Sequence, residues 1–139
     1  MKFNTKTRYG VRTMLEIAIN ASPKGIFQKD IAKNQNISVR YLDHIIAALK
    51  AKGLIISVRG HKSGYTLTRK PCDITLYDIH NAFEPGINIV DCLSESKECE
   101  KENSCASRFF WDELNTLIVN YLESKTLQDL LDQHNAVVV

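Results

Sequence analysis

The 139-residue chain is long enough for one domain with a buried core, and its net charge of +2 conceals a strong asymmetry. Residues 1–70 carry fourteen basic against three acidic residues and residues 71–139 carry four against thirteen, which gives the two halves net charges of +11 and −9. This division predicts that the first half binds a polyanion, although a basic face exposed only to solvent would have the same composition. No run of 18 apolar residues occurs, which argues against a membrane span.

Three helices are predicted in the first fifty residues. Apolar residues recur at helical spacing from Thr5 to about Ala21, and the predicted core-facing stripe consists of Val11, Leu15, Ala18 and Ile19. A short helix over 28–34 and a turn at 35–36 come next, and Ser38 is an N-cap for the third helix. That helix should end at Gly53, and its predicted core stripe is Leu42, Ile45, Ile46 and Leu49.

Two short strands and a further helix follow. Residues 54–58 and 65–67 have strand composition and flank a glycine-bounded basic loop, so we predict a two-stranded wing. Thr75 and Asp78 have the spacing of a capping box, and the helix that they begin should end at Pro85 and Gly86. The order of these elements is that of a winged helix-turn-helix.

The remaining residues contain three cysteines and an apolar helix. The cysteines lie in a loop at roughly 87–104, and a long helix is predicted from Cys105 to about Leu122, with more apolar surface than one small domain usually hides. A short helix over 127–131 and a frayed tail complete a mainly α fold. We therefore expect a DNA-binding domain at 1–84, a cysteine-rich loop at 85–106, and a dimerisation helix with its tail at 107–139.

The predicted second helix of the helix-turn-helix pair should lie in the major groove of DNA. The side chains expected near the bases are Ser38, Arg40, Tyr41, Asp43 and His44. The wing is expected to place Arg59 in a minor groove and to bring His61 and Lys62 to phosphates. Contacts from the first helix to the DNA backbone are expected from Thr7, Arg8 and Tyr9.

Several of these segments resemble the IscR/NsrR-type family of bacterial winged-helix regulators. The matching motifs are Lys6-Thr-Arg-Tyr-Gly-Val-Arg12, Ile37-Ser-x-x-Tyr-Leu-Asp43, Gly53-Leu-Ile-x-Ser-Val-Arg-Gly60 and Gly64-Tyr-x-Leu67. The resemblance covers about residues 1–133 and implies a homodimer, swapped through the long helix, that binds a pseudo-palindromic operator in double-stranded DNA. It also implies an iron–sulfur cluster held by Cys92, Cys99 and Cys105.

The source of a fourth cluster ligand is open. Members of this family use a histidine three residues after the third cysteine, where this chain has Arg108, or a residue of the first helix, where it has Arg8 and Arg12. Thiolates suit iron–sulfur clusters and zinc, but the spacing is longer than that of zinc ribbons. We favour a 2Fe–2S over a 4Fe–4S cluster, and we expect Cys72 to be a half-buried apolar residue outside the site.

The sequence thus predicts a cytoplasmic, homodimeric DNA-binding regulator that senses iron–sulfur, redox or nitric oxide status. No Gly-rich phosphate loop or nucleophile–base set is evident, so we expect neither an enzyme nor a small-molecule substrate. An electron carrier that uses the cysteines is a competing hypothesis, but it has no need of a basic wing. The remaining alternative is a cluster-free winged-helix regulator controlled by a protein partner or by thiol oxidation.

Overall fold

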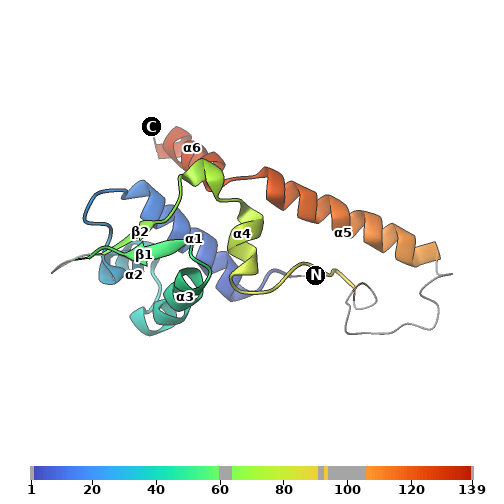
Figure 1. Cartoon of the computed structure of the whole chain (residues 1–139), viewed down its shortest axis with the longest axis horizontal. Coiled ribbons are helices and arrows are strands. Elements are labelled where there is room, and N and C mark those ends of the chain that lie inside the picture. The colour runs from blue at the N-terminus through green and yellow to red at the C-terminus, as the bar shows by residue number, and fades with distance from the viewer. Residues whose placement is uncertain (1, 60–63, 91–92, 94–105, 139) are drawn as a thin grey trace.

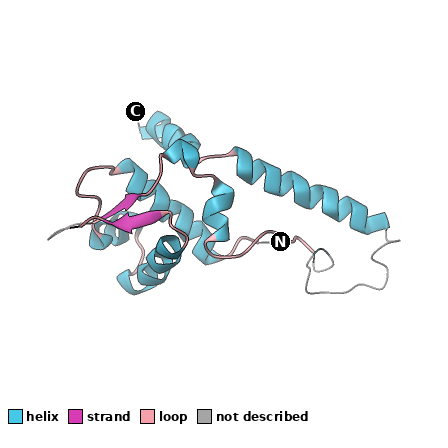
Figure 2. Ribbon diagram, viewed as in Figure 1, coloured by secondary structure: helices cyan, strands magenta, loops and turns pink. Residues whose placement is uncertain are grey.

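The computed structural model describes residues 2–59, 64–90, 93 and 106–138. Within these ranges the chain forms six α-helices, one short 3-10 helix and one antiparallel pair of strands (Figures 1 and 2). The first helices and the strands gather into one body, from which the long helix α5 projects (Figure 1). The predicted mainly α, winged helix-turn-helix fold is confirmed.

Helix α1 runs from Thr5 to Ile19 and begins where the Asn4 side chain accepts a hydrogen bond from the Thr7 backbone N–H at 2.7 Å. The predicted core-facing stripe was partly wrong, because the buried face is centred on Met14 and Ile17. Of the four predicted residues only Ala18 is fully buried. The reason is that α1 is covered by several elements at once, so its contacts extend beyond one narrow stripe.

Helices α2 (Gln28–Gln35) and α3 (Val39–Ala51) form the predicted helix-turn-helix. Asn36 makes the turn in the left-handed region, with φ 53°. The Ser38 hydroxyl then accepts from the Tyr41 backbone N–H at 3.1 Å, which confirms the predicted N-cap. The predicted stripe of α3 is also confirmed, and its four buried residues are Leu42, Ile45, Ile46 and Leu49.

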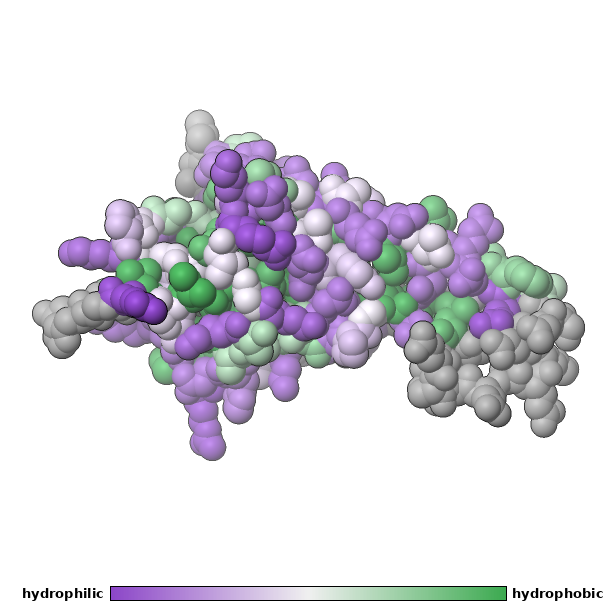
Figure 3. All heavy atoms as spheres, viewed as in Figure 1, coloured by the Kyte–Doolittle hydropathy of each residue, from purple (hydrophilic) through white to green (hydrophobic). Residues whose placement is uncertain are grey.

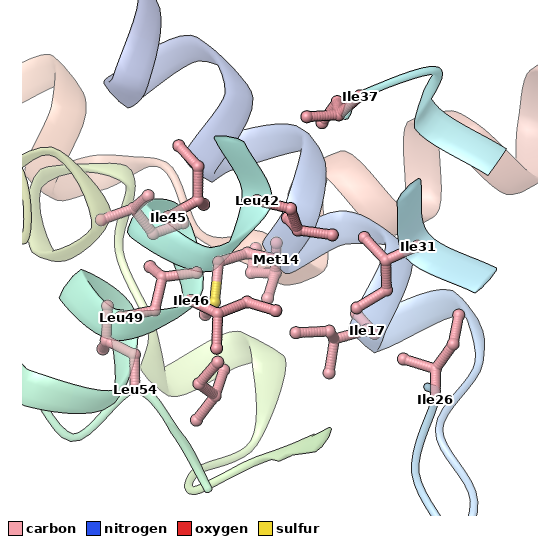
Figure 4. Close-up of a cluster of buried hydrophobic side chains, with 14 of the residues drawn as sticks. Met14, Ile17, Ile26, Ile31, Ile37, Leu42, Ile45, Ile46, Leu49 and Leu54 are labelled. Carbon is pink, nitrogen blue, oxygen red and sulfur yellow. The ribbon is translucent and has the colours of Figure 1, made fainter. Parts of the chain in front are cut away.

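One hydrophobic core joins these helices to the strands (Figure 4). Strands β1 (Ile55–Ser57) and β2 (Tyr65–Leu67) pair antiparallel, with Ile56 opposite Thr66. Ile26, before α2, exchanges two backbone hydrogen bonds with Tyr65. A side chain at Gly64 would lie 2.3 Å from the Ile26 carbonyl oxygen, so this close approach of two backbones requires glycine.

A 3-10 turn (Pro71–Asp73) leads into helix α4 (Leu76–Asn81). The capping box is confirmed, because the Thr75 side chain accepts from the Asp78 N–H and the Asp78 carboxylate accepts from the Thr75 N–H, both at 3.0 Å. The helix is shorter than predicted and ends before Pro85. Cys72 was predicted to be half-buried, but it is exposed, because the 3-10 turn that carries it lies at the surface.

Helix α5 (Ala106–Ser124) is followed at once by α6 (Leu127–Val138). The Thr126 backbone N–H donates to the Asp129 carboxylate at 2.8 Å, which starts α6 and lowers the pKa of that carboxyl. The predicted frayed tail was wrong, since α6 continues to Val138. Leu127 is fully buried in the same core as α1, so α6 packs on the body that α1, α2, α3 and the strands form. The division into three segments otherwise stays a prediction.

Candidate nucleic-acid interface

The N-terminal turns of α3 present polar side chains on an open face. Ser38, Arg40 and His44 are exposed and Tyr41 is half-buried, and these four residues line a shallow hollow of about 240 Å³. They come together because the opposite face of α3 is occupied by its buried leucines and isoleucines. The structure therefore groups four of the five α3 residues that the sequence predicts to approach the bases.

The same face continues onto α1 through an aromatic contact. The ring of Tyr9 meets that of Tyr41 edge-to-face, with 5.6 Å between the centroids, and the Arg12 guanidinium lies 4.8 Å above the Tyr9 ring. A second hollow of about 540 Å³ lies between the two helices and is lined by Thr5, Tyr9, Asn36, Ile37, Ser38 and Tyr41. Thus α1 extends the polar face by a further strip.

Arg12 also connects α1 to the end of α2, next to the turn that leads into α3. Its Nε donates to Gln35 Oε1 at 2.9 Å and one terminal nitrogen donates to the Gln35 backbone carbonyl. Gln35 Nε2 in turn donates to the Glu16 carboxylate at 2.9 Å, and Glu16 also accepts from the side chains of Asn20 and Asn34. Glu16 is 8% exposed, so this network fixes the turn of the helix-turn-helix against α1.

Thr7 and Arg8 of α1 are both predicted to contact the DNA backbone, but they lie in different surroundings. Thr7 is 5% exposed and points into the body, so the prediction that it contacts the DNA backbone was wrong. Arg8 is exposed, and it lines a cavity of about 930 Å³ between the start of α1, Leu76 of α4 and Leu122 of α5. Arg8 therefore borders this cavity, whereas the next residue, Tyr9, makes the contact with Tyr41.

The wing is described at its two ends. Arg59 is exposed two residues after the end of β1, and the Val58 backbone N–H donates to the Gly64 carbonyl at 2.9 Å, which brings the two ends together. The predicted contact residues His61 and Lys62 lie outside the described residues. Asp43, the fifth predicted residue of α3, is exposed and accepts a hydrogen bond from Gln28 Nε2.

Replacing Arg40 by alanine should weaken operator binding by about tenfold at fixed salt, because one arginine contact to a base or phosphate is lost. Fluorescence anisotropy with a labelled duplex measures the change. Lys125→Ala is the control, since it removes one positive charge from the α5–α6 junction. Equal affinities of the Arg40 variant and the unmodified chain would remove Arg40 from the interface.

The three cysteines predicted to hold a cluster lie outside the described residues, but both flanks of their loop are described. Asn115, in the middle of α5, accepts from the Ile89 backbone N–H at 2.9 Å and donates to the Ile87 carbonyl at 2.8 Å. At the other flank, α5 begins at Ala106, the residue after Cys105. Both ends of the cysteine loop are therefore attached to the same helix.

Only some residues of the face formed by α3 and α1 could be predicted from the sequence. The Ser38 cap and the arginine near the start of α3 can be read directly, whereas the roles of Arg12 and Gln28 are not apparent. Arg12 lies one helical turn after Tyr9, so helical spacing alone could have placed both residues on one flank of α1. Gln28 had no comparable signal, because its partners lie 11 and 15 residues away in another helix.

Known proteins resemble this chain over nearly its whole length, in both sequence and structure. Residues 3–133 match the Rrf2 family, described as an iron-dependent transcriptional regulator. The chain is 37% identical to the protein rrf2 of Nitratidesulfovibrio vulgaris, over 94% of this chain and 87% of that one. It superposes on CymR, the global cysteine regulator of B. subtilis, with a TM-score of 0.80, 33% identity and coverage of 96% and 98%. It also superposes on IscR of T. potens with a TM-score of 0.77 and 32% identity, over 96% of this chain and 88% of that one.

Proposed function

Because the chain belongs to the Rrf2 family of transcriptional regulators, we propose that it is a homodimer whose binding to an operator is controlled by an iron–sulfur cluster. Regulators of this family bind DNA and have a non-enzymatic role. Within the described ranges, none of the helices has the length and apolar character needed to cross a bilayer. Operator binding would place the protein in the cytoplasm.

The observation that carries the DNA-binding proposal is the open face of α3. A recognition helix must bury one side in its own domain and keep the other free, and α3 does both. In this arrangement Ser38, Arg40, Tyr41, Asp43 and His44 approach the bases. Arg59 enters a minor groove, while Arg8, His61 and Lys62 contribute backbone contacts.

The homodimer proposal rests on the exposed apolar face of α5. Phe110, Leu117 and Tyr121 are 58%, 60% and 63% exposed, and their spacing of seven and four residues places them on one side of the helix. No described residue of α5 is fully buried, and apolar residues recur along this projecting part of the surface (Figure 3). A second copy is the occupant that fits, since two identical α5 stripes can cover each other around a two-fold axis.

Replacing Leu117 by aspartate is expected to convert the dimer to a monomer, because it places a charge in the middle of the apolar face. Light scattering coupled to size exclusion measures the mass. Val137→Asp is the matched control, because Val137 is 74% exposed but lies at the end of α6. A Leu117→Asp protein with an unchanged mass would contradict the proposed interface.

For the cluster, the donor set fits a soft metal centre with three thiolates, from Cys92, Cys99 and Cys105. Arg108 is a permanent cation and cannot supply the fourth ligand, which stays open. We favour the 2Fe–2S form, and a bound cluster would supply sensitivity to iron, oxidants or nitric oxide. Because Asn115 and the start of α5 hold the two flanks of the loop, a change in the loop would act directly on the dimer helix.

The absorption spectrum and iron content of protein purified without oxygen test the cluster. Visible absorption bands with bound iron would support it, and colourless, iron-free protein after reconstitution would contradict it. The thiol-oxidation alternative is favoured if such colourless protein still changes its operator affinity on oxidation. CymR, which is named a cysteine regulator, keeps that alternative in consideration.

A further inference from the structure

One glutamine side chain joins the two helices of the helix-turn-helix. Gln28 is the first residue of α2, and its Nε2 donates to the Val39 backbone carbonyl at 3.2 Å and to the Asp43 carboxylate at 2.5 Å. Val39 begins α3 and Asp43 lies one turn further along it. The amide is thus fixed by a backbone group and in turn restrains an acidic side chain on the recognition helix.

Asp43 is unusual among the residues of this face because it is negatively charged. A carboxylate that approaches DNA is repelled by the phosphates unless it accepts a hydrogen bond from a base, for which the cytosine amino group is suited. In the part of the chain that the structure describes, no lysine or arginine forms an ion pair with Asp43. Its charge is therefore not cancelled by a cation within the protein.

The contact from Gln28 restrains the orientation of this charge without neutralising it. The amide is uncharged and engages Oδ1, so the carboxylate is held toward α2 by one oxygen. No hydrogen bond to Oδ2 is formed among the described residues, which leaves that oxygen free for a base. A side chain fixed before binding loses less conformational entropy when it meets DNA, and a fixed acceptor discriminates more sharply between bases.

We infer that Gln28 is a specificity-determining residue that acts through Asp43. It positions the carboxylate of Asp43 to select a cytosine and to reject the other bases at one position of each half-site. Gln28 itself is a positioning residue, since the two N–H groups of its amide are already donated to Val39 and Asp43. This inference rests on the proposed function, because it requires α3 to lie in the major groove.

A double-mutant cycle on the full chain tests the inference. Duplexes are first selected from a random-sequence library by the unmodified protein, and each position of the selected site is then varied singly. The affinities of Gln28→Leu, Asp43→Ala and the double variant are measured for this set at one salt concentration. Gln128→Leu is the matched control, because Gln128 makes the same kind of contact to Asp132, at 2.8 Å, on α6.

We expect Gln28→Leu to reduce discrimination at one base position by about fivefold, within the range of coupling between side chains in contact. Asp43→Ala should remove discrimination at that same position, and Gln28→Leu should then have no further effect. The control should keep the discrimination of the unmodified chain.

Three results would overturn the inference. Gln28→Leu could weaken binding to all duplexes equally together with a lower Tm, which is the outcome of a purely structural role. Second, Gln28→Leu could change base discrimination equally in the presence and in the absence of the Asp43 carboxylate. Third, Gln28→Leu could leave base discrimination unchanged. An unmodified protein that selects no sequence would instead contradict the proposed function itself.

Discussion

Replacing Leu42 by alanine should lower the free energy of unfolding by about 3 kcal/mol and the Tm by roughly 10 °C. Leu42 is completely buried, at the point where α3 packs on Met14 and Ile31 in the shared core (Figure 4). The truncated side chain would leave a cavity between helices that cannot close around it, because each is also held by other contacts. Thermal and urea denaturation followed by circular dichroism measure the loss.

Val39→Ala is the control within the same helix. Val39 is 51% exposed, so its truncation removes little packing and should change the Tm by no more than a few degrees. Equal losses for the two variants would mean that the inner face of α3 is assigned wrongly. That result would also remove the support for assigning the opposite, outer face of α3 to DNA contact.

Replacing Cys99 by serine is expected to abolish cluster binding and the response of operator affinity to oxidants. The hydroxyl of serine is a poor substitute for a thiolate at iron, and the chain offers only three cysteines in this loop. Iron content, visible absorption and operator affinity with and without an oxidant measure the effect. We expect loss of the absorption bands and an affinity that no longer depends on the oxidant.

Cys72→Ser is the control, since Cys72 is exposed in the 3-10 turn before α4 and is outside the predicted loop. This variant should retain both the iron and the response. A Cys99→Ser protein that binds iron as the unmodified chain does would exclude Cys99 as a ligand.

The local signals of the sequence predicted most of the proposed DNA-binding face. The Ser38 cap, the four apolar residues of α3 and the Thr75–Asp78 capping box involve residues close in the chain, and all appear as expected. Such features depend on helix geometry alone, which is fixed by a few neighbouring residues. They were sufficient to orient α3 and hence to group Ser38, Arg40, Tyr41 and His44.

Features that depend on how helices cross could not be predicted in this way. The contact of Gln28 with Asp43 and that of Arg12 with Gln35 join residues of different helices. The wide buried face of α1 has the same origin, because several elements pack on it and its sequence period shows only one stripe. The length of α6 was underestimated because its last two turns are mostly polar or exposed and give little apolar periodicity.

Sequence-specific binding of two symmetric half-sites through α3 is the central claim, and selection from a random duplex library at fixed salt tests it most directly. The unmodified protein should enrich an inverted repeat whose half-site centres lie about 10 base pairs, or a multiple of that, apart. Arg40→Ala should enrich it less strongly, in line with its expected tenfold lower affinity. The claim would be contradicted if the selected duplexes shared no sequence and if the unmodified chain and the Arg40 variant bound them with equal affinity.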